Sequence, residues 1–315
     1  MEIPKIDLKV TESSEVEEWD VLVGSVGFEA RSSYVPLTWA SKSRLRLASA
    51  FDTHKVLSYS ENLAVLEKAG YEIEEHGELD IREWLYKRLA DVQKPSMEPL
   101  CVAVDTSSFS RGRLAQLLLG AIDLATSRPL VLDLAYAPAD YSPPPTGDTA
   151  IKIFGPVATE FAGWAREQDM ATSCVLGLGY EAERAVGALE YLEPIGAWAF
   201  TPSGVDARYD ASVVLANKTV WDATPPPIRV DYRVDDPMWM FLELESLIFG
   251  LRNSTRPVLV PLGPKIFAAA CLLVGVIHAP NVAVWRVSGG DSEEPFQRHA
   301  KGPIFALRAS LAPLQ

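Results

Sequence analysis

The 315-residue sequence has little of the chemistry that binds metals or forms disulfides, with three cysteines and four histidines. The cysteines lie far apart, each in or beside an apolar stretch, which indicates buried thiols in a reducing compartment. The histidines show no metal-ligand spacing with one another or with cysteine. We therefore expect a cytoplasmic protein with no metal site and no cofactor.

Long hydrophobic runs and an excess of basic residues are also lacking. The longest apolar run, Ile266 to Ile277, is shorter than a membrane span and predicts a buried helix. The amino terminus has no basic segment followed by an apolar one, so we expect no secretory signal. The net charge is −13, whereas a protein that binds duplex DNA needs a basic face. These features predict neither a membrane partner nor duplex DNA.

Several familiar catalytic and nucleotide-binding motifs are missing. The sequence contains no Walker A loop, and Gly24-x-x-Gly27 and Gly177-x-Gly179 are only fragments of the dinucleotide-binding glycine motif. It has no Gly-x-Ser-x-Gly elbow, and no cysteine has an evident histidine partner. Any function must therefore rest on other residues.

One pattern occurs twice in the chain. An apolar strand leads into Gly27, Phe28, Glu29 and Arg31, and a degenerate copy leads into Gly179, Tyr180, Glu181 and Arg184. Further along, a second apolar strand ends at Asp105 in the first half and at Pro261 in the second. The spacing is 78 residues from Gly27 to Asp105 and 82 from Gly179 to Pro261. This repeated order predicts an internal duplication of a domain of roughly 150 residues.

The fold class follows from strands that alternate with helices of moderate length. This alternation is typical of βαβ units, and the core strands are apolar on both faces, as in parallel sheets. We predict an α/β protein with two tandem Rossmann-like domains, 1–148 and 149–315, related by duplication. A Pro-rich connector at 141–148 separates them, and the last residues, Pro303 to Leu311, are expected to form an edge strand.

Acidic and basic residues stand directly after the first strand of each half. In one interpretation, Glu29 and Glu181 cap the following helix or pair with Arg31 and Arg184 inside the domain. In the other, each arginine binds a phosphate and each glutamate orients it or accepts from a sugar hydroxyl. The sequence leaves both alternatives open.

The second loop of the first half is rich in hydroxyl groups. Asp105, Thr106, Ser107, Ser108 and Arg111 come at the expected end of a parallel strand, where hydroxyls and helix N–H groups suit a phosphate. Its counterpart offers Gly263, which lets the backbone approach a ligand, and Lys265, which supplies charge. The alternative is a hydrogen-bonded turn with an Asp cap.

A duplicated plan with a polar loop after the first strand, together with the loops Asp105-Thr-Ser-Ser108 and Gly263-Pro-Lys265, resembles the CARF and SAVED sensor domains of prokaryotic antiviral systems. The resemblance implies paired Rossmann-like units that bind an oligonucleotide second messenger. It also implies a role in antiviral defence.

The leading hypothesis is that a nucleotide or other phosphorylated ligand is sensed in a cleft between the two halves. One alternative is an enzyme that hydrolyses a glycosidic or phosphate-ester bond of a nucleotide or nucleic-acid end, with Glu29, Asp105 or Glu181 as general acid or base. Another is a non-catalytic subunit of a larger complex, with a protein partner from the same operon. The sequence does not choose between enzyme and binding protein.

Overall fold

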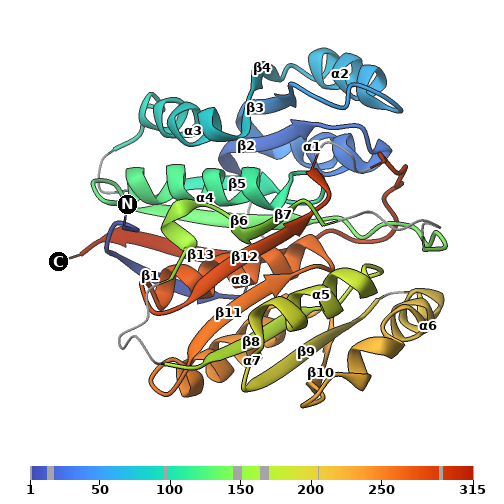
Figure 1. Cartoon of the computed structure of the whole chain (residues 1–315). Helices are drawn as coiled ribbons and strands as arrows, with labels where there is room; N and C mark the ends of the chain where they lie inside the picture. Colours follow the sequence, from blue (N-terminus) through green and yellow to red (C-terminus); the bar gives the residue numbers. More distant parts are fainter. Residues whose placement is uncertain are drawn as a thin grey trace. The chain divides into compact units, whose positions relative to one another are not determined.

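The computed structural model describes residues 2–12, 18–95, 98–144, 151–163, 170–204, 206–290 and 294–314. The chain forms two compact units (Figure 1). The amino-terminal unit contains Pro4–Asp140 and Pro295–Gln315, and the second unit contains Tyr141–Glu294 with Met1–Ile3. The predicted boundary between 148 and 149 falls outside the described residues. None of the helices in the described ranges has the length and apolarity needed to span a membrane.

The amino-terminal unit is an α/β layer structure around one sheet, as the alternation of elements predicted. Within the described residues the sheet has seven strands in the order β1-β13-β6-β5-β2-β3-β4. The strands are β1 (Ile6–Thr11), β2 (Trp19–Val26), β3 (Ser43–Phe51), β4 (Glu72–His76), β5 (Leu100–Asp105), β6 (Leu130–Tyr136) and β13 (Phe305–Pro313). The helices are η1 (Ala30–Ser33), α1 (Tyr34–Trp39), η2 (Ala40–Lys42), α2 (Tyr59–Lys68), η3 (Glu78–Asp80), α3 (Ile81–Ala90) and α4 (Arg111–Ala125).

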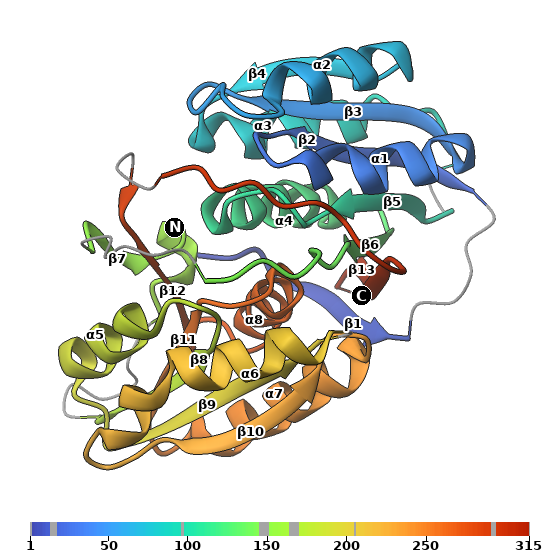
Figure 2. The ribbon, with the colours of Figure 1, turned by 90° about the vertical axis from the view of Figure 1, so that its right-hand side faces the viewer.

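Five strands, from β4 to β6, pair in parallel. Every residue of β2 is buried, because helices cover both faces of the sheet at this central strand. Figure 2 shows α1 and α2 on one face and α3 and α4 on the other. The chain moves outward from β2 to β4 and then returns to start β5 on the other side of β2. Strand order therefore reverses between β2 and β5, the place where ligands bind in open α/β sheets.

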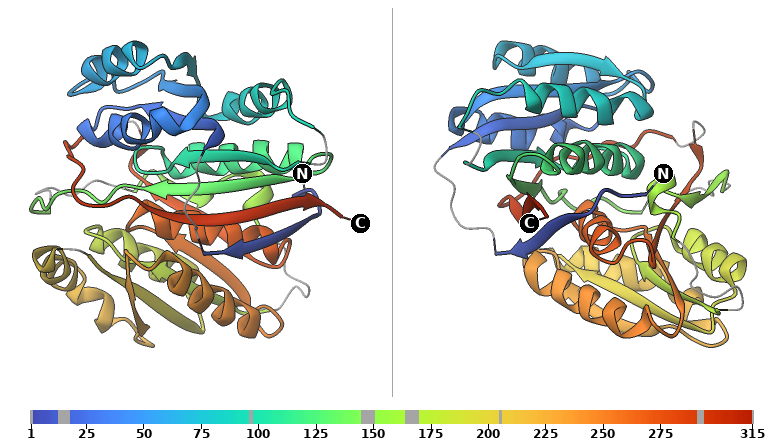
Figure 3. Two further views of the ribbon diagram at one scale, coloured as in Figure 1. Left: turned by 180° about the vertical axis from the view of Figure 1, so that it is seen from behind. Right: turned by 90° about the vertical axis from the view of Figure 1, so that its left-hand side faces the viewer.

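The end of the chain completes this sheet. β13 lies between β6 and β1 and pairs with both in antiparallel fashion (Figure 3). The prediction of an edge strand at the carboxyl terminus is therefore wrong, because β1 covers the far side of β13. The pairing places Arg308 of β13 opposite Asp133 of β6. Asp133 accepts two hydrogen bonds from Arg308, at 2.8 and 2.9 Å, and one from Trp19 at 2.8 Å.

The second unit is built on a second mainly parallel sheet. Its six strands among the described residues have the order β10-β9-β8-β11-β12-β7, and only β7 is antiparallel to its neighbour. The strands are β7 (Ile153–Pro156), β8 (Thr172–Gly177), β9 (Gly196–Ser203), β10 (Ile228–Arg233), β11 (Arg256–Pro261) and β12 (Ala283–Ser288). The helices are η4 (Thr159–Phe161), α5 (Ala182–Leu192), α6 (Ala207–Ala216), η5 (Lys218–Asp222), α7 (Pro237–Leu251) and α8 (Lys265–Ile277).

Helix α8 accounts for the longest apolar run of the sequence. Its residues from Ile266 to Val276 are all buried, as the prediction of a buried helix required. On the other face of the sheet, a core cluster joins β8, β9 and β11 to α5 and α6 through small and branched residues such as Ala185, Ala188 and Val213. Each unit thus has its own hydrophobic core.

Replacing Arg308 by Met should destabilise the amino-terminal unit by about 3 kcal/mol, because Asp133, 1% exposed, would remain charged in the core without its bidentate partner. A urea titration followed by circular dichroism measures the effect. Arg229→Met is the control, since Arg229 pairs with Asp231 on the surface and should cost less than about 1 kcal/mol. Equal effects of the two substitutions would contradict the structural role of the buried pair.

Candidate functional site

The loop after β2 contains an ion pair inside the protein. Glu29 and Arg31 are 7% and 5% exposed, and the Arg31 Nε atom donates to a Glu29 carboxylate oxygen. A second nitrogen of Arg31 donates to the carbonyl oxygen of Ala137 at 3.2 Å. The guanidinium also lies over the Tyr136 ring, 5.9 Å from its centroid. The internal ion pair that the sequence left as one alternative is therefore present at this loop.

Glu29 is engaged through both of its carboxylate oxygens. The second oxygen accepts from Arg298 at 2.7 Å. Burial opposes the charge on Glu29, but the guanidinium groups of Arg31 and Arg298 outweigh it, so the pKa of Glu29 is lowered. Glu29 is consequently a fixed anion that holds two arginines.

A return segment, residues 295–302, brings Arg298 to this loop. The amide oxygen of Gln297 accepts from the backbone N–H of Ala30 at 2.9 Å, and its nitrogen donates to the Ser58 hydroxyl at 2.8 Å. The backbone N–H of Arg31 donates to the carbonyl oxygen of Arg298 at 3.0 Å. The return segment thus contacts the loops that follow β2 and β3. Sequence reasoning missed it, because 267 residues separate Ala30 from Gln297 and no local pattern records such a contact.

The loop after β5 uses most of its hydroxyl groups to hold its own shape. The Thr106 hydroxyl donates to the carbonyl oxygen of Ala135 at 2.8 Å, and the Ser107 hydroxyl accepts from the N–H of Ala137 at 2.9 Å. One carboxylate oxygen of Asp105 accepts from the N–H of Ser107 at 2.9 Å. The other oxygen of Asp105 and the hydroxyl of Ser108 are buried and have no hydrogen-bond partner. Between Asp105 and Ser110, these are the two side-chain oxygens without a hydrogen-bond partner.

Asp105 lies in a strongly perturbed environment. It is completely buried, and burial raises its pKa to about 6 against the opposing effect of the Ser107 hydrogen bonds. Arg31 and Glu29 are close enough for their charges to act on Asp105 as well. The structure therefore brings the two predicted loops of the first half together around Asp105.

Helix α4 begins at this loop with a capped amino terminus. The Ser110 hydroxyl accepts from the N–H of Arg113 at 3.1 Å, and Arg111 is the first helical residue. Arg113, which the sequence analysis did not single out, is 3% exposed and donates to Asp52 at 2.9 Å. Its guanidinium lies 4.1 Å from the centroid of the Phe51 ring. The sequence could have singled out Arg113 because it lies in the first turn of a predicted helix, where a cation is unfavourable.

The predicted residues of the second unit lie on two loops that pack closely together. The N–H of Gly263 donates to the carbonyl oxygen of Gly177 at 2.9 Å. A Cβ atom at Gly263 would lie 2.0 Å from the carbonyl oxygen of Leu178, so no other residue fits there. Glu181 and Arg184 stand at the start of α5, and Lys265 is the first residue of α8. Glycine at position 263 therefore serves the contact between the loops themselves.

A buried asparagine supports the first loop in each unit. The side-chain nitrogen of Asn62 donates to the carbonyl oxygens of Gly27 and Glu29 at 2.9 and 2.8 Å. Asn217 donates to the carbonyl oxygen of Gly179 at 2.7 Å. The asparagines follow their glycines by 35 and 38 residues. That repeated spacing was present in the sequence and could have identified both of them.

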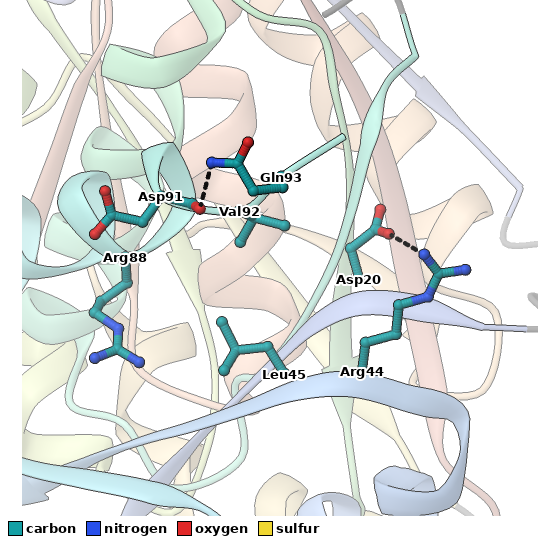
Figure 4. A pocket seen from close by; sticks show the side chains of 7 residues that line it. All are labelled: Asp20, Arg44, Leu45, Arg88, Asp91, Val92 and Gln93. Atoms are coloured by element: carbon teal, nitrogen blue, oxygen red, sulfur yellow. Dashed lines mark hydrogen bonds and ion pairs between the residues drawn. The ribbon is translucent and has the colours of Figure 1, made fainter. Parts of the chain in front are cut away.

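Two hollows open on the surface of the amino-terminal unit. The larger, about 410 Å³, is lined at the starts of β2 and β3 by Asp20 and Arg44 and at the end of α3 by Arg88 (Figure 4). It lies at the sheet edge opposite the candidate loops. The smaller, about 300 Å³, is lined by Ala30, Arg31 and His299 among others, beside the Glu29 ion pair. Within the described ranges, no three His, Cys, Asp or Glu side chains gather as metal ligands would.

The raised pKa of Asp105 predicts a pH effect on stability. Between its ordinary value of 3.8 and its folded value of about 6, the folded protein binds more protons than the unfolded chain, so stability falls as the pH rises. Asp105→Asn should therefore stabilise the protein near pH 7.5 by up to about 3 kcal/mol. Near pH 4.5 the difference should largely disappear, because Asp105 is then mostly neutral.

Thermal unfolding of the wild type and of Asp105→Asn between about pH 4.5 and pH 7.5 measures the effect. Asp91→Asn, at an exposed carboxylate after α3, is the control. A constant difference between Asp105→Asn and the wild type at all pH values would show that Asp105 does not titrate in this range.

Comparison of the chain with protein-family models and with curated proteins finds no match.

Proposed function

We propose that the amino-terminal unit binds a nucleotide or another phosphorylated ligand at the edge of its sheet where β2 and β5 end. In this proposal binding is a sensing event, of the kind that the resemblance to CARF and SAVED domains implies for antiviral defence. The ligand is held by the loop from Asp105 to Arg111 and by the positive end of α4.

We also infer that the two units are Rossmann-like copies of one ancestral domain. In both, the parallel strands lie in the same order: the third, second, first, fourth and fifth in the chain. In both, the loop after the first of these strands carries a glycine whose carbonyl oxygen accepts from a buried asparagine, Asn62 or Asn217. A shared order with a shared internal contact supports common descent more strongly than strand order alone.

The observation that carries the binding proposal is a basic residue at the same place in both units. Arg111 is the first residue of α4, and Lys265 is the first residue of α8. Each helix follows the fourth parallel strand and begins at the reversal of strand order. The first turn of a helix disfavours cations, so a basic first residue at the same place in both units supports an anion that binds at this end.

The other predicted residues contribute less directly. Arg31 is held by Glu29, so it supplies positive charge from a fixed position. The hydroxyls of Thr106 and Ser107 hold the loop. Glu29 orients Arg31 and Arg298. The proposed contacts with the ligand therefore come from Asp105, Ser108 and Arg111.

One observation favours an enzyme as the second candidate function. The pKa of Asp105 is raised to about 6 by burial, and a general acid or base works best with a pKa close to the pH at which it operates. Glu29 is less suited to proton transfer, because two arginines lower its pKa. In this alternative Asp105 is the acid or base in hydrolysis of a nucleotide ligand.

Arg111→Ala should weaken binding of such a ligand about tenfold or more, because it removes a charge-assisted hydrogen bond. The probes are nucleoside 5′-monophosphates, nucleoside 5′-triphosphates and cyclic dinucleotides, and the measurements are thermal shift and calorimetry. Lys265→Ala tests the corresponding loop of the second unit. Arg229→Ala, on an exposed strand, is the control. Unchanged affinity in Arg111→Ala for a probe that binds the wild type would remove the α4 loop from the site.

The fate of the bound probe separates the two candidates. A sensor should gain thermal stability with the probe and leave it intact after hours of incubation, as chromatography of the recovered nucleotide would show. An enzyme should release a product, and Asp105→Asn should abolish its formation.

A further inference from the structure

In the loop from Asp105 to Ser110, two side-chain oxygens are buried without a hydrogen-bond partner, and they differ in chemistry. The second carboxylate oxygen of Asp105 is buried and can only accept while the group is ionised. The Ser108 hydroxyl, also buried and without a partner, can donate as well as accept. Buried polar atoms are nearly always satisfied, so an unsatisfied pair on one loop requires an explanation.

Asp105 is distinctive among the acids of the described residues. No other carboxylate oxygen there is buried without a hydrogen-bond partner. Glu29, the neighbouring acid, is engaged by Arg31 and Arg298. A donor that enters this part of the site therefore finds its acceptor at Asp105.

A phosphate does not fit these two atoms. A fully ionised phosphate oxygen only accepts hydrogen bonds, and Asp105 would repel it. An alcohol fits both, because its O–H donates to Asp105 while its oxygen accepts from Ser108. The charge and the donor pattern thus assign the phosphate to the Arg111 side of the loop and a hydroxyl to the Asp105 side.

Ser108 is the more exposed of the two residues. It is partly exposed as a residue, although its hydroxyl is covered, whereas Asp105 is fully buried. Gly27, from the loop after β2, lies beside Ser108: a Cβ atom there would lie 3.2 Å from the Ser32 hydroxyl oxygen and 3.6 Å from both the Ser108 Cβ and the Phe51 ring. A hydroxyl can therefore reach the pair only when the loop after β2 shifts.

The loop after β11 has no equivalent of this pair among the described residues. β5 ends at Asp105 and β11 ends at Pro261, which offers no side-chain acceptor. Gly263, in the loop after β11, is packed against Leu178. The corresponding loop of the second unit therefore offers no carboxylate to a hydroxyl.

We propose that Asp105 and Ser108 bind a ribose hydroxyl, so that the ligand is a ribonucleotide and its deoxy counterpart is rejected. This inference rests on the proposed binding of a nucleotide and specifies its sugar. A deoxy ligand binds more weakly because the buried carboxylate oxygen of Asp105 is then left without a hydrogen-bond partner in the complex.

The test compares the four ribonucleoside 5′-triphosphates with their 2′-deoxy and 3′-deoxy analogues by calorimetry on the full chain. The wild type should bind at least one ribonucleotide about tenfold or more tightly than one of its deoxy analogues. Asp105→Asn and Ser108→Ala should lower the affinity for the ribonucleotide toward that of the deoxy analogue and leave the affinity for the analogue unchanged.

Each outcome has a defined meaning. Equal affinity of the wild type for a ribonucleotide and both of its deoxy analogues overturns the inference while the proposed nucleotide binding stands. Discrimination that persists unchanged in both variants also overturns it. Absence of binding by every probe contradicts the proposed function and this inference with it. If Asp105→Asn fails to fold, the wild-type comparison and Ser108→Ala still decide.

Discussion

The buried carboxylate of Glu29 is the contact on which the edge of the amino-terminal unit depends. It binds Arg31 from its own loop and Arg298 from the return segment, 269 residues further along the chain. Glu29 and Arg31 have little exposure to water, and either charge alone would carry a large desolvation penalty, so the two are stable as a hydrogen-bonded pair, which Arg298 joins from a partly exposed position. The set therefore fixes the loop after β2 and the path of the returning chain together, and β13 then completes the sheet.

The polar residues at this edge of the sheet fall into two groups. Arg31, Thr106 and Ser107 complete hydrogen bonds that the folded backbone needs, so their chemistry is already in use. Asp105 and Ser108 retain unused hydrogen-bonding capacity in a buried place. A buried group without a hydrogen-bond partner costs free energy, so these two side chains do not serve the stability of the loop as Thr106 and Ser107 do.

The two units share the order of their parallel strands and differ in the residues of their loops. Their parallel strands have the same order, and a buried asparagine supports the first loop in each. In the second unit, however, the loops meet backbone to backbone around Gly263, and the strand that corresponds to β5 ends in Pro261. A framework of this kind can keep its packing while the loops of the two units carry different side chains, because the loops lie outside the hydrophobic cores.

The sequence by itself determined the α/β class, strand β2, helix α8 and the positions of the candidate loops. These features follow from the spacing of apolar residues, the alternation of strands with helices and the turn residues, all of which are local properties of the chain. It also supplied the repeated spacing that now coincides with equal strand order. Only the tertiary structure decided that Glu29 pairs with Arg31 and Arg298, that β13 is interior to its sheet, and that one oxygen of Asp105 stays open. Those features depend on which groups, distant in the sequence, come into contact when the chain folds. A contact between residues more than 260 positions apart produces no local pattern in the sequence.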